Sequence, residues 1–323
     1  MSLQRRIRIF TNIGELALHR SDYLNDVSPF IDWLTTTVYN NSDEILHEWT
    51  SSGHRTIGIP KGEKWCCSSL WDAYNKYYWG SLDPNEPTNH PKHRITSISD
   101  TEHCLERLSD QLKSNLSGDE TINLSSTCEK VLIWGGVGRN KHIASHLRYS
   151  LTCEEDRRSY LNACANLLTS EMKELTGIGE ISIGGIAHPV QIDSGTTKIF
   201  SLIVPNFIIY DSRVGAALGI LIAKWARVKN ISEIPGALHF PWGSGSKTTN
   251  RNANELLSSH KPVFPRMPRG SARLGFNIKA SWICEQLAAN IASLSTDKFS
   301  LMPTPKRIRA IEAALFMLGY SIN

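Results

Sequence analysis

Residues 192–224, IDSGTTKIFSLIVPNFIIYDSRVGAALGILIAK, restrict the possible folds of this chain more than any other segment. The segment is apolar almost throughout, yet it carries Lys198 at the head of one apolar run and Asp211 ahead of another. Apart from a tyrosine, no other ionisable residue lies between these two. Burying a lone ammonium or carboxylate costs free energy unless the group is paired or used. We therefore expect Lys198 and Asp211 to occupy special positions in the fold.

The composition is that of an ordinary soluble globular protein, with 323 residues, of which 41% are hydrophobic and 20% charged. The N-terminus has basic residues but no continuous apolar core, so we expect no signal peptide. No apolar segment is long enough to span a membrane. The seven cysteines are scattered, which favours reduced thiols over disulfides or a zinc site. We expect a cytoplasmic monomer without a metal or cofactor.

The net charge is only +4, but the basic residues are unevenly distributed. The stretches 131–153 and 256–284 contain no acidic residue, and the second contains Arg266, Arg269 and Arg273. Such segregation can produce a positive face on a nearly neutral protein. The alternative is that both stretches are solvated loops.

Apolar residues recur three and four positions apart over most of the chain, which is the pattern of amphipathic helices. Strand patterns are few, at 181–186 and 207–209, and they do not alternate with helices as in a parallel α/β fold. We therefore predict a mainly α protein with few short strands. The predicted helices are 28–39, 66–79, 101–115, 141–151, 156–175, 212–228, 277–294 and 304–318.

The polar stretch 114–127, rich in serine and asparagine, is the best candidate for a linker. It would separate an N-terminal helical lobe, 1–127, from a longer C-terminal region, 128–323. A second irregular stretch, 238–273, is rich in proline and glycine. Long stretches of this kind in compact proteins are often functional loops.

Lys198 allows two interpretations. A lysine at the start of a helix is most often a solvated surface residue. Here the apolar residues that follow leave its side chain little polar surface, and a lysine against such a surface has a lowered pKa. Since a neutral amine can form a Schiff base, Lys198 is a candidate nucleophile.

Asp211 also fits two roles, and the two are compatible. It stands immediately before an apolar helical pattern, where aspartate is a preferred N-cap. A carboxylate held by backbone N–H groups stays ionised and oriented. Facing an anomeric carbon, it would stabilise the positive charge that develops as a glycosidic bond breaks.

These residues resemble the catalytic segment of the helix–hairpin–helix superfamily of DNA glycosylases. In that superfamily a Gly-x-x-Lys turn opens a helix, an apolar run follows, and an aspartate caps the next helix, as in SGTTK, IFSLIVPN and FIIYDSRVGAAL here. The chain is more similar still to bacterial proteins with an 8-oxoguanine DNA glycosylase fold, whose aspartate lies in an [IL]-x-Asp-Ser-Arg-Val context. The C-terminal stretch 303–319 is similar to the closing helix of that group. The matching motifs cover a minor part of the chain.

The chain departs from this family in three places. No Leu-Pro-Gly-[IV]-Gly hairpin directly precedes Lys198, and the similar string LTGIG at 175–179 lies too early in the chain. The iron–sulfur cysteines of the family are absent, since only Cys284 lies in the C-terminal third. The N-terminal lobe has no counterpart and is our candidate for substrate selectivity.

The resemblance implies a two-lobed helical enzyme that binds double-stranded DNA in a cleft between the lobes and releases a damaged or modified base, leaving an abasic site. The target nucleotide would leave the base stack and enter a pocket. Lys198 would be the nucleophile and Asp211 the catalytic carboxylate. In the monofunctional alternative, Asp211 activates water and Lys198 only places charge. The expected DNA contacts are Arg213, Arg266, Arg269 and Arg273, and the expected base-stacking residues are Trp242 and Trp282.

Several alternatives stay open. Arg213 is equally suited to a structural ion pair, and a single tryptophan is more often a core residue. The excised base would be oxidised guanine in a repair glycosylase or lyase. Members of the similar bacterial group also resemble proteins of phage defence, and in such an enzyme the excised base would be a hypermodified one such as glucosylated hydroxymethylcytosine. Two further classes are a non-catalytic DNA-binding protein of the same fold and a hydrolase or transferase acting on free nucleosides.

Overall fold

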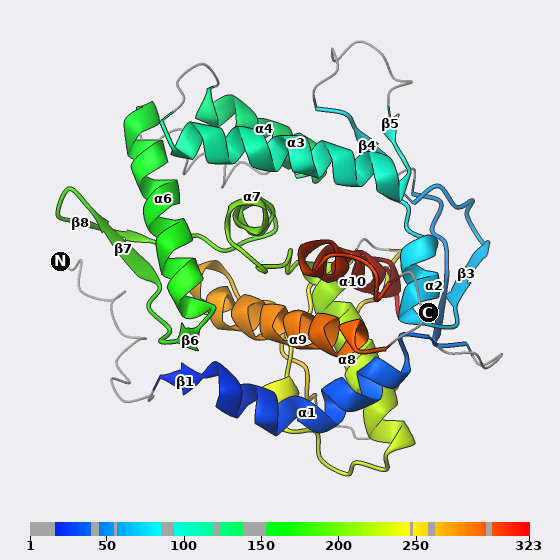
Figure 1. The fold of residues 1–323 in the computed structure, drawn as a ribbon. Helices are drawn as coiled ribbons and strands as arrows, with labels where there is room; N and C mark the ends of the chain where they lie inside the picture. Colours follow the sequence, from blue (N-terminus) through cyan, green and yellow to red (C-terminus); the bar gives the residue numbers. More distant parts are fainter. Residues whose placement is uncertain are drawn as a thin grey trace, which may run out of the picture.

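The computed structural model describes residues 17–39, 45–54, 57–84, 94–118, 123–137, 153–245, 248–257, 262–294 and 299–323. Helices dominate this part of the chain, which confirms the prediction of a mainly α protein (Figure 1). The described strands are short and form four separate antiparallel pairs. None of these pairs extends into a larger sheet, so helix packing forms the core.

The elements have the following bounds. The described helices are α1 (Arg20–Thr36), α2 (Leu70–Asn75), α3 (Ile98–Leu116), α4 (Leu124–Trp134), α6 (Glu154–Glu171), α7 (Thr196–Ile203), α8 (Ser212–Val228), α9 (Leu274–Ala292) and α10 (Thr304–Leu318). Short 3-10 helices lie at Gly236–Leu238, Ala253–Leu256 and Gly270–Arg273. The strand pairs are β1 (Leu18–His19) with β6 (Glu174–Leu175), β2 (His47–Thr50) with β3 (Lys64–Cys67), β4 (Ser81–Leu82) with β5 (Arg94–Ile95), and β7 (Glu180–Ile183) with β8 (Ile186–Pro189).

Most predicted helices are confirmed. The predictions 212–228 and 304–318 have the same bounds as α8 and α10, and α3, α6 and α9 differ from their predictions only at their ends. The prediction 66–79 is wrong in extent, because β3 occupies its start and Ser69 caps a helix of only six residues. The predicted helix 141–151 and most of the basic stretch 131–153 lie outside the described residues.

The expected linker is shorter than predicted. Helix α3 continues to Leu116, and Asn123 caps α4 by accepting a hydrogen bond from the Ser126 N–H. Buried residues from both sides of this connection belong to one hydrophobic cluster. Helix α1 packs against α8 and α9, and α2 packs against α10.

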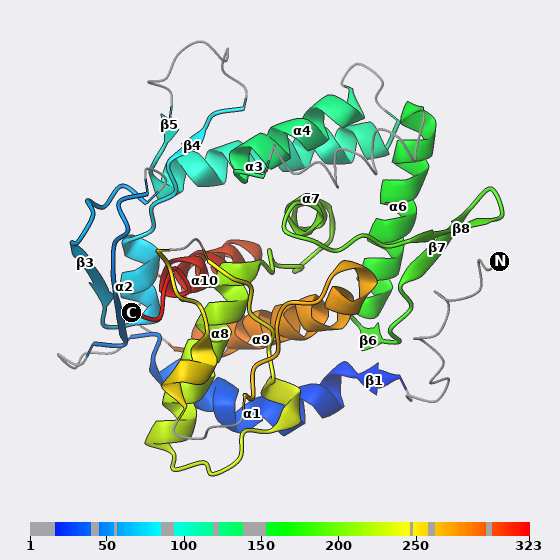
Figure 2. The same cartoon turned by 180° about the vertical axis from the view of Figure 1, so that it is seen from behind.

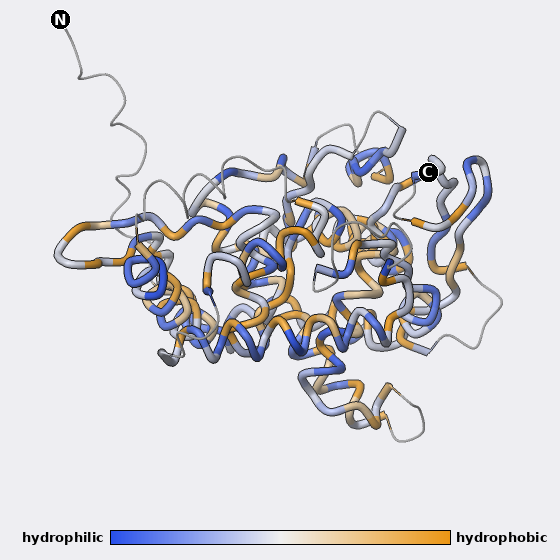
Figure 3. The backbone as a smooth tube through the Cα atoms, turned by 90° about the horizontal axis from the view of Figure 1, so that it is seen from above, coloured by the Kyte–Doolittle hydropathy of each residue, from blue (hydrophilic) through white to orange (hydrophobic). Residues whose placement is uncertain are grey.

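The helices form layers around α7 (Figures 1 and 2). Helices α3 and α4 lie side by side, α7 packs against both, and α8, α9 and α10 lie beyond α7. Helix α8 is buried over most of its surface, as expected for a helix that is apolar nearly all round. Hydrophobic backbone segments run through the middle of the molecule and also reach an outlying loop at its edge (Figure 3). In the part of the chain described above, no helix combines the length and apolarity needed to cross a bilayer.

Candidate active site

The first turn of α7 carries Lys198, and Asp193 fixes that turn. Asp193 Oδ1 accepts hydrogen bonds from the backbone N–H groups of Gly195 (2.8 Å) and Thr196 (3.0 Å). Thr196 Oγ1 in turn accepts one from the Asp193 N–H (2.9 Å). These reciprocal bonds satisfy N–H groups that a helix start leaves unpaired. They also give Lys198 a fixed backbone.

The segment between α7 and α8 is not a strand, so the prediction for 207–209 is wrong. Its backbone groups pair with side chains of the surrounding helices instead of a second strand. The hydrogen bonds run from Ile208 N–H to Ser281 Oγ (3.1 Å), Asn277 Nδ2 to Ile208 O (2.9 Å), Ile209 N–H to Glu312 Oε2 (2.8 Å), Tyr210 N–H to Thr197 Oγ1 (3.0 Å) and Arg273 Nη2 to Tyr210 O (2.7 Å). Tertiary packing therefore sets the position of the next residue, Asp211.

Asp211 caps α8, as predicted. Its Oδ1 accepts hydrogen bonds from the N–H groups of Arg213 (2.8 Å) and Val214 (3.2 Å). Its other oxygen, Oδ2, lies 3.8 Å from Nζ of Lys198. One carboxylate oxygen thus holds the helix start while the other faces the amine.

Burial and mutual attraction shift the pKa values of this pair. Burial lowers the pKa of the Lys198 amine below its ordinary 10.5, and the Asp211 carboxylate partly offsets this effect. Burial alone would raise the pKa of Asp211, but Lys198, Arg213 and Arg251 outweigh it and hold that pKa below 3.8. At neutral pH Asp211 is therefore ionised, and Lys198 gives up its proton more readily than a surface lysine. Its amine meanwhile donates a hydrogen bond to the Ser194 carbonyl (2.6 Å).

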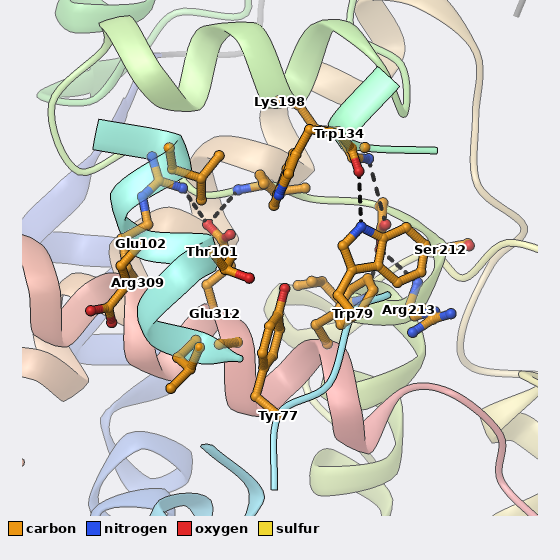
Figure 4. Close-up of a pocket in the computed structure, with 18 residues that line it drawn as sticks. Tyr77, Trp79, Thr101, Glu102, Trp134, Lys198, Ser212, Arg213, Arg309 and Glu312 are labelled. Carbon is orange, nitrogen blue, oxygen red and sulfur yellow. Dashed lines mark hydrogen bonds and ion pairs between the residues drawn. The ribbon is translucent and has the colours of Figure 1, made fainter. Parts of the chain in front are cut away.

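Lys198 and Asp211 line one pocket, with a volume of about 110 Å³ (Figure 4). Figure 4 shows Tyr77 and Trp134 on opposite sides of it, with the Tyr77 hydroxyl pointing toward its centre. The aromatic lining residues are Tyr77, Trp79, Trp134 and Phe316, and polar ones include Thr101, Glu102, Arg213, Arg309 and Glu312. A third of the lining residues therefore come from before residue 127, the region expected to supply selectivity.

Glu312 is a second buried carboxyl on this wall. Its Oε2 accepts hydrogen bonds from the Ile209 N–H and from Arg309 Nη1, both at 2.8 Å. Burial raises the pKa of Glu312 above its ordinary 4.5, although Arg309 acts in the opposite direction. Of the two buried carboxyl groups on the wall, Asp211 is ionised, and Glu312 keeps its proton to higher pH than an ordinary glutamic acid.

Arg213 lies in the pocket wall and not on an outer surface. Its side chain is buried, and the guanidinium carbon lies 4.1 Å from the ring centre of Phe316 and 5.1 Å from that of Tyr320. Burial lowers the pKa of Arg213 to about 10, and Arg251 adds to this effect. The expectation that Arg213 reaches a DNA phosphate is therefore corrected, because packing turns the side chain inward.

Two further expected DNA contacts are core residues. Arg273 is 5% exposed and holds the Tyr210 carbonyl, so it supports the backbone before Asp211 instead of facing solvent. Trp282 is completely buried; its indole N–H donates to the Met172 carbonyl (2.6 Å) and its ring packs on Tyr23. Neither side chain has a surface that DNA could reach.

Arg266 and Arg269 are exposed, as expected of DNA contacts. The Arg266 guanidinium carbon lies 3.7 Å from the ring centre of Trp242, which is itself buried, so this tryptophan has no free face for a base. The neighbouring Gly243 packs closely against Ser212. A Cβ added to Gly243 would lie only 2.6 Å from the Ser212 Cβ. Since Ser212 lines the pocket, this loop lies beside the pocket.

Sequence reasoning did not identify Tyr77, Trp79, Trp134 or Glu312. One of them had a usable signal. Glu312 stands in the apolar helical pattern RAIEAALFML. As for Lys198, burying an ionisable side chain in such an apolar segment costs free energy unless the group is paired or used. The three aromatic residues carry no comparable local signal.

A second hollow, of about 600 Å³, adjoins the pocket. It lies between α3, the end of α7 and the start of α10, and shares Glu102, Leu105 and Arg309 with the pocket. Its other polar lining residues include Glu106, Ser109 and Asp110. A ligand group that passes these shared residues would enter a larger and more polar space.

Among the residues with assigned positions, no cluster of three or more His, Cys, Asp and Glu could hold a metal ion. Comparison of the chain with protein-family models, curated protein sequences and solved structures gave no match. The site therefore has to be interpreted from its own geometry: a buried amine beside an ionised carboxylate in an aromatic pocket.

Proposed function

We propose that this protein is a DNA N-glycosylase, an enzyme that breaks the bond between a modified base and its deoxyribose. The observation that carries the proposal is the Lys198 amine, 3.8 Å from the Asp211 carboxylate on the wall of an aromatic pocket. More particularly, we propose an enzyme acting on a bulky modified base, through a covalent intermediate on Lys198.

In this mechanism the target nucleotide swings out of the duplex and its base enters the pocket. The neutral amine of Lys198 attacks C1′ while the glycosidic bond breaks, and the electron pair leaves with the base. The departing base takes up a proton from water. A proton then moves from Nζ to O4′ as the sugar ring opens, which leaves a protonated Schiff base between Nζ and C1′. Water hydrolyses it to an abasic site and the lysine ammonium, which returns its proton to water. Asp211 stabilises the positive charge on the sugar.

The monofunctional alternative uses the same residues. Asp211 would activate a water molecule that attacks C1′, and Lys198 would only place a positive charge. In either version the regions 1–127 and 128–323 would act as two lobes, with DNA bound where the pocket opens between them. Arg266 and Arg269 would hold phosphates, contacts that carry no sequence information. The protein would act as a cytoplasmic monomer without a cofactor.

The second hollow favours a bulky substrate over oxidised guanine. A substituent on the base would pass Glu102 and Arg309 and meet the polar residues beyond them. Glucosylated hydroxymethylcytosine, whose sugar carries several hydroxyl groups, suits such a lining, and this supports an antiphage role. An 8-oxoguanine repair enzyme is the alternative, and it would leave the hollow unused.

Mass spectrometry of released bases tests the proposal. The protein is incubated with phage DNA that does or does not carry hypermodified cytosine, with oxidised genomic DNA and with free nucleosides. We expect a modified base to be released from DNA alone. Salt-sensitive binding to DNA without release of any base would indicate a non-catalytic DNA-binding protein. Release from nucleosides would indicate a nucleoside hydrolase or transferase.

Gly135→Ala is expected to displace the amine without disturbing the backbone. Gly135 has φ −72°, which alanine adopts readily, but an added Cβ would lie 2.3 Å from Cδ of Lys198. We expect base release to fall about 10- to 100-fold, because small misplacements of a reacting group are costly. The matched control is Gly236→Ala, where nothing lies within 4 Å of the added Cβ. Equal single-turnover rates for the two variants would contradict the placement of Lys198.

The pH dependence of the reaction should report the lowered pKa of Lys198. The neutral amine is the reactive form, so the single-turnover rate should rise with pH and level off below pH 10.5, the ordinary pKa of lysine. Because the Asp211 carboxylate raises the pKa of Lys198, Asp211→Asn should move the normalised profile to lower pH. A rate that still climbs at pH 10.5 would show that the amine titrates like a surface lysine.

A further inference from the structure

Three buried polar atoms on the pocket wall have no hydrogen-bond partner among the described residues: Oγ1 of Thr101, Nε1 of Trp134 and Nη1 of Arg213. The last two can only donate, and they belong to side chains that are 5% and 8% exposed. Buried polar groups are nearly always paired, because leaving one unpaired costs the full free energy of its desolvation. Since both atoms belong to residues that line the same pocket, a ligand in that pocket would remove the cost.

The chemistry of these two groups restricts what the ligand presents to them. An indole N–H and a guanidinium N–H can only donate hydrogen bonds. The ligand atoms that face them must therefore be acceptors, such as a carbonyl oxygen or an unprotonated ring nitrogen. Every common nucleobase carries such atoms along its edge.

The surroundings of Trp134 favour a recognition role over a purely structural one. Its backbone carbonyl accepts the Trp79 indole N–H (2.9 Å), which fixes the end of α4. Figure 4 shows the Trp134 ring projecting from this anchor toward the pocket, opposite Tyr77. The adjacent Gly135 leaves the space that the Lys198 side chain occupies. The end of α4 thus carries both the unpaired donor and the gap that the Lys198 side chain fills.

We propose that Trp134 is a specificity-determining residue whose indole N–H binds an acceptor on the expelled base, assisted by Nη1 of Arg213. This inference rests on the proposed glycosylase function and adds the recognition of the base edge. It also gives the end of α4 a role in selectivity, next to residues from the N-terminal region.

Trp134→Phe tests the inference, since it removes the N–H and keeps an aromatic ring. The probes are duplexes with 8-oxoguanine or with 5-hydroxymethylcytosine, glucosylated or not, and a duplex with a tetrahydrofuran abasic analogue. We expect single-turnover base release to fall about 10- to 100-fold, the cost of an unpaired buried acceptor. Affinity for the abasic duplex should stay unchanged, because that DNA carries no base. If Trp134 were purely structural, Trp134→Phe would lower both the rate of base release and the affinity for the abasic duplex.

The matched control is Trp65→Phe. Trp65 is also buried with an unpartnered Nε1, but it lies on β3, stacked on Trp49 and away from the pocket. The Trp65→Phe variant should release base at the wild-type rate. If Trp134→Phe does not fold, benzothienylalanine at position 134 is the second variant. It has sulfur in place of the indole N–H and keeps the shape of the tryptophan side chain.

The outcomes separate this inference from the proposed function. If the wild-type protein releases base and the Trp134 variants match it, the inference is wrong and the glycosylase function stands. If Trp134→Phe loses affinity for the abasic duplex as well, Trp134 is structural. If the wild-type protein releases no base from any of these duplexes, the proposed function falls, and this inference falls with it.

Discussion

Replacing Asp211 by asparagine is expected to lower base release about 10²- to 10⁴-fold, the range for losing one electrostatic or acid–base group. The substitution removes the charge and keeps the shape. Asparagine is as good an N-cap as aspartate, and its carbonyl oxygen can still accept from the N–H groups of Arg213 and Val214. Single-turnover assays give the rate, and thermal unfolding shows whether the fold is retained.

Asp72→Asn is the matched control for this variant. Asp72 also accepts a backbone N–H, that of Ser68 (3.0 Å), and pairs with Lys76 (2.9 Å), but it does not line the pocket. Its loss of charge should leave base release unchanged. A folded Asp211→Asn protein that releases base at the wild-type rate would remove the carboxylate from both versions of the mechanism.

Replacing Lys198 by methionine is expected to abolish the covalent intermediate. Borohydride reduces the Schiff base to a stable amine, so the wild-type protein should become cross-linked to a substrate duplex, and the variant should not. Methionine has a similar length and fills the buried space, and it also removes the cost of desolvating an amine. We therefore expect the variant to fold, with base release lowered about 10³-fold or more, as for other lost nucleophiles.

The control for this experiment is Lys64→Met, on an exposed lysine that pairs with Glu48 (3.3 Å). It should cross-link like the wild-type protein. A cross-link that persists in Lys198→Met would place the nucleophile elsewhere. Base release at the wild-type rate without a cross-link would eliminate the Schiff-base version and leave Asp211 to activate water.

Local signals were sufficient for α8 and α10, two of the helices that line the site. Asp211 and the apolar repeat after it define α8, and α10 starts after Pro303 and ends just before Gly319. The prediction failed for α4, because its first turn, Leu-Ser-Ser-Thr, looks like the polar linker before it. It failed for 207–209, because hydrogen bonds to distant side chains such as Asn277 and Ser281 replace a strand partner there.

The aromatic residues show where local reasoning stops. The sequence favours Trp242, in the string FPWGSGS, and Trp282, on the helix after the basic stretch, by position alone, yet packing covers the first with Arg266 and buries the second. Tyr77 and Trp134, which do line the pocket, are remote in sequence from Lys198. Which face of a ring remains open depends on neighbours that sequence spacing does not reveal.

The sequence by itself determined the mainly helical fold and the two residues of interest, because an ionisable group in an apolar segment is costly wherever that segment packs. Only the tertiary structure decided that Lys198 and Asp211 face each other, since the segment between them is held by side chains from α7, α9 and α10. It also decided which arginines stay in solvent and which aromatic rings line the pocket. Those choices depend on burial, which is a property of the packed chain and not of any one segment of it.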